Sequence, residues 1–168
     1  MILRLRRQCN KLLRELELSR SFSVETLCTR LAVHRGRPLY VQALPDAAAL
    51  AGPCGVWLET ETEDFIFYES NTSPLHQDHI VLHEIGHMLR QHPATDLLPD
   101  SVFEGLFPDL DRGMVTRLLG RSSYNSWQER EAEAVAGILR EASELGGDAR
   151  CNVDSAHRAA IAFGVSRH

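Results

Sequence analysis

The sequence predicts a single α+β domain, and three observations support this fold class. Segments with helical spacing of apolar residues occupy both halves of the chain, and short strand-like runs lie between them. The length of 168 residues suits one domain with a core of its own. Apolar residues at 43% and charged residues at 24% are ordinary for a globular protein. We therefore expect one domain over 1–168, with an N-terminal helix in 1–20 and a tail over 148–168.

Two helices are predicted to open the domain. In 1–20, Leu5, Leu12 and Leu16 form an apolar stripe among basic residues. This pattern indicates a surface helix with a solvated basic face or, alternatively, a docking helix for an acidic partner. A second helix is expected from Ser23, which can cap it, to Val33.

Short strands are predicted next. Arg35-Gly36-Arg37-Pro38 ends the second helix, and Leu39–Val41 reads as a strand. Val56–Glu59 and Phe65–Tyr68 flank a polar turn, which predicts a hairpin and thus a small three-stranded sheet. The run DFIFYE at 64–69 is a candidate edge strand for pairing with an extended peptide, or simply a half-buried strand.

The C-terminal half is predicted to return to helix. Ser73 can cap a helix that has Pro74 at its first position and runs to about Gln91. Residues 93–110, interrupted by prolines, predict an irregular loop and leave open whether it forms a lid. We expect a short helix over 111–119 and a long one over 126–144.

The strongest functional signal is VLHEIGHML, an HExxH motif within the helix that begins after Ser73. His83 and His87 are four residues apart and share one helix face, where two imidazoles can bind one Zn²⁺. Glu84 stands where a carboxylate acts as general base on a water activated by the metal. Chance placement gives roughly 0.03 occurrences of this motif, so its helical context carries weight. Gly86 costs helix stability, which indicates that a second backbone or a substrate approaches closely.

A catalytic zinc site takes three protein ligands, so one more residue is needed. The arrangement HExxHxxGxxH is excluded because Pro93 occupies the third histidine position. His92 falls one residue short and is interpreted as a helix-end residue.

The helix predicted over 126–144 offers glutamates instead. Glu129 and Glu133 are four apart and share a face, whereas Glu131 points away from them. We favour Glu129 as the third ligand and Glu133 as a carboxylate that accepts a hydrogen bond from a ligand histidine, although the reverse assignment stays open. Glu129 also fits a capping box with Ser126, in which it would bind only the helix start.

The two motifs together resemble a known family. HEIGH, followed about forty residues later by EREAEAVAGIL, resembles the ImmA/IrrE family of bacterial metallopeptidases, whose members carry HExxH and then a helix with E-x-[E/Q]-A-[N/D/E]-x-[F/V]-A. CGVWLETETEDFIFYESNTSPLHQDHIVLHEIGHML is similar to the variants common in actinobacteria. The likeness covers most of residues 25–140. Glu133 is a departure, since many relatives carry Asn or Asp there.

The resemblance implies a zincin-like core, with a small sheet packed on the HExxH helix and the glutamate-bearing helix beside it. It implies that Zn²⁺ is held by His83, His87 and Glu129, and that Glu84 is the base. It also implies cleavage of a helix-turn-helix transcriptional repressor as the function. The alternative is a non-cleaving anti-repressor or toxin-like binding protein that keeps a zinc site. Tyr124 is a candidate oxyanion donor or, alternatively, a loop tyrosine packed on the core.

Other classes are disfavoured by composition. A net charge of −5 and a pI of about 5.9 argue against direct nucleic-acid binding. The sequence contains neither a membrane-spanning apolar run nor a signal-peptide core, so we expect a cytoplasmic protein. A cysteine zinc site is not expected because no two of the four cysteines form a CxxC pair. They are Cys9, Cys28, Cys54 and Cys151.

Overall fold

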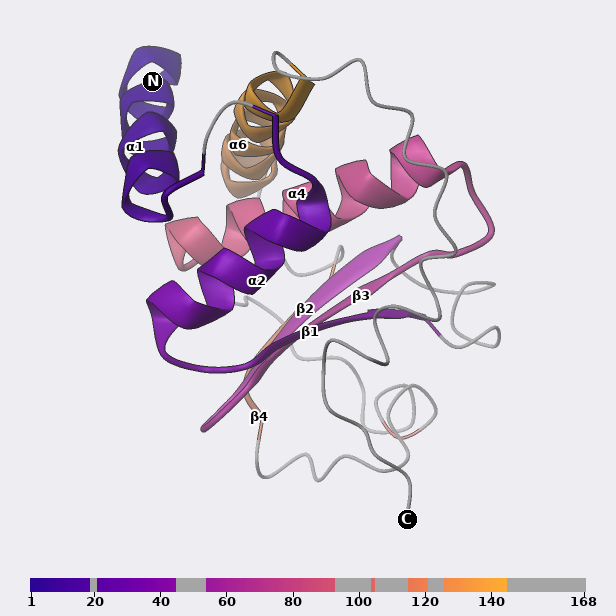
Figure 1. The fold of residues 1–168 in the computed structure, drawn as a ribbon. Helices are drawn as coiled ribbons and strands as arrows, with labels where there is room; N and C mark the ends of the chain where they lie inside the picture. The colour runs from indigo at the N-terminus through magenta and orange to yellow at the C-terminus, as the bar shows by residue number, and fades with distance from the viewer. Residues whose placement is uncertain (19–20, 45–53, 93–103, 105–114, 121–125, 145–168) are drawn as a thin grey trace.

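The structure, a computed structural model, describes residues 1–18, 21–44, 54–92, 104, 115–120 and 126–144. Figure 1 shows the described helices gathered on one side of a twisted sheet, an α+β arrangement as predicted. The elements in chain order are α1 (Ile2–Glu15), α2 (Val24–Arg35), β1 (Leu39–Ala43), β2 (Gly55–Thr60), β3 (Asp64–Tyr68), α4 (Pro74–Arg90), β4 (Val115–Gly120) and α6 (Ser126–Glu144).

The sheet is mixed and has the strand order β1-β3-β2-β4. β2 and β3 form the predicted antiparallel hairpin, and β1 pairs in parallel with β3. A fourth strand, β4, pairs antiparallel with β2. The three predicted strands are therefore present, and the sheet is one strand wider than expected.

One prediction is wrong in this region, and one open alternative is decided. The short helix expected over 111–119 is contradicted, because Val115–Gly120 is a strand. Pairing with β2 supplies the strand's backbone hydrogen bonds and outweighs a weak local preference for helix. Of the two readings left open for 64–69, the edge strand is contradicted, since β3 lies between β1 and β2. The half-buried strand is confirmed, because buried and partly buried residues are mixed along β3.

Helix boundaries follow the predicted capping residues. Ser23 accepts a hydrogen bond from the backbone N–H of Thr26 at 3.0 Å. Ser73 accepts one from the backbone N–H of His76 at 3.3 Å, with Pro74 as the first residue of α4. These caps satisfy backbone donors that a helix start leaves unpaired, so both helices begin where the sequence predicts.

The core lies between the sheet and the helices, with α4 at its centre. Leu82, Ile85 and Met88 of α4 are fully buried, in one cluster with Trp57 of β2 and Ile66 of β3. Apolar residues of α1, α2 and α6 belong to the same cluster, including Leu5, Leu27 and Leu139. The HExxH motif therefore sits on a helix that is packed against the core along much of its length, and this packing fixes its backbone.

Gly86 lies where the backbone of α6 approaches α4 closely. A Cβ added at Gly86 would lie 2.7 Å from the carbonyl oxygen of Ala132 and 3.0 Å from its Cα. Both atoms belong to the α6 backbone, so they cannot move aside as a flexible side chain would. Of the two close approaches predicted from this glycine, a second backbone or a substrate, the structure shows the backbone. It brings α6 against the histidine-bearing part of α4.

This contact predicts opposite effects for two helical glycines. Gly86→Ala is expected to lower the free energy of unfolding by about 1–3 kcal/mol, because the added methyl overpacks the α4–α6 contact. Gly137→Ala is the matched control in α6, where an added Cβ meets nothing within 4 Å. It is expected to raise the free energy of unfolding by about 0.5–1 kcal/mol. Urea unfolding of both variants checks this, and equal responses would contradict the proposed role of Gly86.

Candidate metal centre

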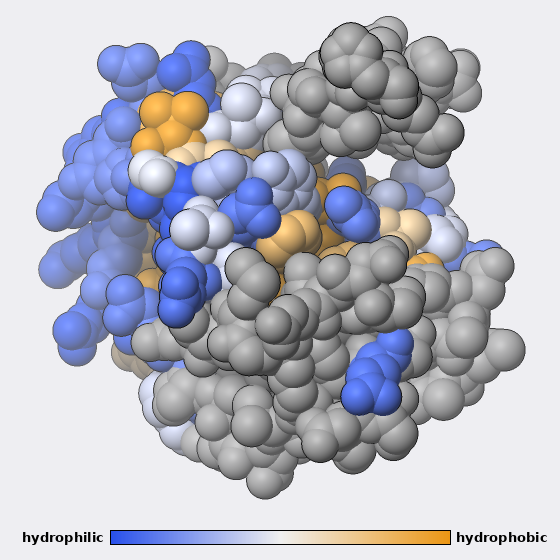
Figure 2. Space-filling model, turned by 90° about the horizontal axis from the view of Figure 1, so that it is seen from below, coloured by the Kyte–Doolittle hydropathy of each residue, from blue (hydrophilic) through white to orange (hydrophobic). Residues whose placement is uncertain are grey.

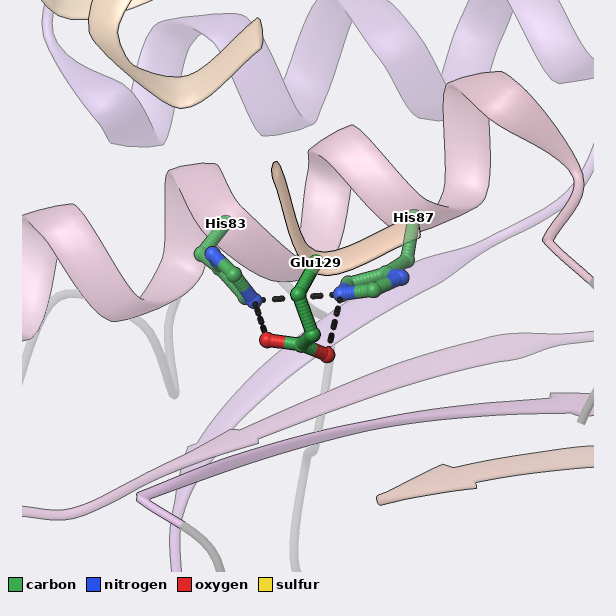
Figure 3. Close-up of side chains that lie close together, drawn as sticks. All are labelled: His83, His87 and Glu129. Atoms are coloured by element: carbon green, nitrogen blue, oxygen red, sulfur yellow. Dashed lines mark hydrogen bonds and ion pairs between the residues drawn. The ribbon is translucent and has the colours of Figure 1, made fainter. Parts of the chain in front are cut away.

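His83 and His87 lie one turn apart on α4 and point their rings toward α6. Their Nε2 atoms are 3.0 Å apart, and Figure 3 shows both rings directed at the same point. His87 is fully buried, whereas the His83 side chain is 20% exposed. The pair therefore presents two nitrogen ligands together at the edge of the core.

Glu129 reaches the same point from the first turn of α6. Its Oε2 lies 3.4 Å from His83 Nε2, and its Oε1 lies 3.5 Å from His87 Nε2. The carboxylate is directed at the histidines (Figure 3), which is the geometry expected of a ligand rather than of a capping box. The ligand atoms of the three residues all lie within 4.8 Å of one another, so the group could hold a metal ion.

The donor set fits zinc. Ligand atoms around a tetrahedral Zn²⁺ at about 2.0–2.1 Å are separated by about 3.3 Å, and the distances among His83, His87 and Glu129 lie near this value. Two imidazoles and one carboxylate are also a common set of protein ligands in catalytic zinc sites. Among the described residues, the buried Oε1 of Glu129 accepts no hydrogen bond, which suits an oxygen that faces a cation.

The electrostatics of His87 suit a ligand. Burial, together with the nearby rings of His83 and His92, lowers the pKa of the His87 imidazole to about 2. The ring is therefore neutral at physiological pH. Neutral imidazole is the form that binds a metal, so His87 needs no deprotonation first.

Glu133 contacts the outer side of the His83 ring. Its Oε2 lies 3.3 Å from His83 Nδ1 and 3.2 Å from His79 Nε2. It therefore occupies the place predicted for a carboxylate that orients a ligand histidine. Among the described residues, the group able to hold a metal contains Glu129 and not Glu133, which favours the first of the two assignments that the sequence left open.

His92 and Glu131 make contacts that sequence reasoning missed. His92 follows the end of α4, as expected, but it is buried and its Nδ1 lies 3.0 Å from His87 Nδ1. Its Nε2 lies 2.9 Å from Glu131 Oε2, which also pairs with Arg90 Nε at 3.1 Å. Burial acts to raise the pKa of Glu131, but Arg90 and His92 outweigh it and the pKa is lowered. The Glu131 carboxylate is therefore charged at neutral pH. By helical spacing it lies on a different face of α6 from Glu129.

Glu84 lies in the same helix as the two histidines, and its side chain is close to the sheet. Its side chain lines a cavity of about 370 Å³ together with His83, Glu129 and Glu133. Gly55, the first residue of β2, makes this approach possible, because a Cβ there would lie 2.7 Å from Glu84 Oε1. The buried Glu84 carboxylate therefore lines the same cavity as His83 and Glu129, two of the three residues that could hold a metal. The remaining lining residues are Cys54, Gly55, His76, His79, Ile80 and Arg130.

Some predicted features lie outside the described residues. These are Tyr124, the tail over 148–168 and the loop over 93–110 apart from residue 104.

Cys9, Cys28 and Cys54 are free, and burial raises the pKa of Cys9 to about 11 and that of Cys28 to about 12. These two thiols are therefore protonated at neutral pH.

The chain has no match among family models, curated proteins or solved structures. The resemblance to the ImmA/IrrE family thus stays a prediction from its motifs.

None of the helices in the described ranges has the length and apolarity needed to span a membrane. On the face shown in Figure 2, hydrophilic side chains make up most of the described surface, and apolar ones form small groups between them.

Proposed function

We propose that the protein is a zinc-dependent endopeptidase. The observation that carries this proposal is the meeting of His83, His87 and Glu129 from two helices. Glu84 lines one cavity together with two of them, His83 and Glu129. A site for a metal alone would not need the fourth residue. A carboxylate next to two histidines and a glutamate is the combination used for metal-assisted peptide hydrolysis.

The roles follow from position. Zinc, when bound, would polarise a peptide carbonyl and lower the pKa of a water toward about 7. In this proposal Glu84 takes a proton from that water and returns it to the leaving amine. The burial of Glu84 keeps bulk water from competing for that proton, since only 5% of the residue is exposed.

The proposed substrate is a protein, and specifically a helix-turn-helix repressor. This part rests on the sequence resemblance to the ImmA/IrrE family. The cavity is lined by both basic and acidic groups, including Arg130 and Glu133. A polar lining of mixed charge suits a polypeptide chain better than an apolar small molecule.

The proposal is tested by digestion of a proteome-derived peptide library with the zinc-loaded protein. New peptide termini, identified by mass spectrometry, are expected with zinc and absent after chelation. A purified helix-turn-helix repressor bound to its operator is then added as substrate. Release of the repressor without cleavage would favour the non-cleaving anti-repressor instead, and an absence of cleavage in both assays would contradict the endopeptidase.

A further inference from the structure

We infer that His92 and Glu131 are positioning residues for the metal ligand His87, joined to it in one buried chain of hydrogen bonds. The inference rests on the proposed zinc site and extends it to residues outside the HExxH motif. The chain runs from His87 Nδ1 to His92 Nδ1 at 3.0 Å, and from His92 Nε2 to Glu131 Oε2 at 2.9 Å. Beyond the hydrogen bonds, the same oxygen forms an ion pair with Arg90, whose Nε lies 3.1 Å away.

The proton positions in this chain follow from metal binding. If His87 binds zinc through Nε2, its neutral ring carries the proton on Nδ1. That N–H can then donate to His92 Nδ1, which leaves the proton of His92 on Nε2. This second N–H donates to the Glu131 carboxylate. Every donor faces an acceptor, so one set of tautomers satisfies the whole chain with His87 ready to bind metal.

The end of α4 is shaped to bring His92 back under His87. Gln91 adopts the left-handed conformation, with φ 50° and ψ 41°. The backbone N–H of His92 then donates to the carbonyl oxygen of His87 at 3.2 Å. A left-handed residue other than glycine is uncommon, and here the turn places the His92 ring beside the ligand ring. The His92 ring also contacts Trp127 of α6 edge-on, with centroids 5.5 Å apart.

The Nδ1 atoms of the two ligand histidines differ in how exposed their hydrogen-bond partners are. Glu133, beside His83, has a side chain that is 58% exposed. The side chains of His92 and Glu131 are only 2% and 8% exposed. Hydrogen bonds of buried groups are stronger, and leaving one unmade costs more. The His92 chain is therefore expected to matter more to the site than the Glu133 contact does.

Two substitutions at His92 separate positioning from packing. His92→Phe keeps an aromatic ring against Trp127 but cannot accept the proton of His87 Nδ1. His92→Asn loses the ring, but its amide oxygen can replace the acceptor Nδ1. The zinc dissociation constant is measured for each by competition with a chromophoric chelator. Thermal unfolding of the zinc-free proteins provides the readout of packing.

We expect zinc binding to weaken by about 10–100-fold in His92→Phe and by less in His92→Asn, the range typical of residues that orient metal-bound histidines. A dissociation constant of His92→Phe within twofold of wild type would overturn the inference, and so would weaker binding by His92→Asn than by His92→Phe. If His92→Phe does not fold, Glu131→Gln decides instead, because it leaves both rings in place. At least about threefold weaker binding is expected for it, since the charged acceptor of the chain is lost, and unchanged binding would overturn the inference. Failure of the proposed function is distinguishable, because wild type itself would then fail to bind zinc or to cleave peptides.

Discussion

Glu84→Gln is expected to lower the rate of peptide cleavage by about 10²–10⁴-fold while the zinc content stays at the wild-type level. Glutamine has nearly the same shape as glutamate, so the α4 backbone and the contact with Gly55 are kept. Its amide cannot accept the proton that a general base must take. Since Glu84 is not one of the three residues that could hold the metal, its charge is not needed for zinc to remain bound.

The measurement is the cleavage rate of a peptide identified in the library digestion, with zinc quantified in the same samples. Glu25→Gln is the control, because Glu25 is exposed on α2 and lies outside the cavity that holds the site. It is expected to cleave like wild type. Wild-type cleavage by Glu84→Gln would contradict the assignment of Glu84 as the base. Loss of zinc together with activity would instead show a role in holding the metal.

Glu129→Gln is expected to weaken zinc binding by about 1,000-fold or more, because one of three protein ligands loses its charge. Glu133→Gln is the matched comparison one turn further along α6. It removes the same charge at a carboxylate that contacts His83 Nδ1 and is largely solvated. We expect an effect of at most about 10–100-fold there.

Competition with a chromophoric chelator measures both dissociation constants. The test compares the two changes in zinc dissociation constant, because both variants change the net charge equally. A larger loss in Glu133→Gln than in Glu129→Gln would reverse the assignment of the third ligand. Equal and small losses in both would indicate that zinc, if bound, is held elsewhere.

Local patterns were sufficient to predict much of the fold. Ser23 and Ser73 mark helix starts because a side-chain acceptor next to a helical period is a local signal. The hairpin of β2 and β3 follows from two strand-like runs around a polar turn. Gly86 predicted the close approach of a second backbone or a substrate, since a helix-destabilising residue inside a helix requires a compensating gain.

What the sequence could not predict depends on tertiary contacts. β4 is a strand because β2 offers it a partner, which no local window shows. β3 is internal to the sheet because β1 pairs on its free side, and parallel pairing of distant segments has no sequence signal of its own.

The metal group was only partly readable from the sequence. Helical spacing places His83 and His87 together and separates Glu131 from Glu129. His92 was interpreted as an ordinary helix-end residue because the left-handed turn at Gln91, usually marked by glycine, carries no such mark here. The spacing of Glu129 from Glu131 correctly placed them on different faces. It could not show that the second face meets a buried histidine.

The zinc content of the wild-type protein tests the central claim most directly. The protein is purified without chelators and analysed by inductively coupled plasma mass spectrometry, beside His83→Ala. A zinc content near one ion per chain is expected for wild type, with almost none in His83→Ala, since that variant retains only two of the three ligands. A folded wild-type protein that carries no zinc and takes up none when zinc is added would contradict the account.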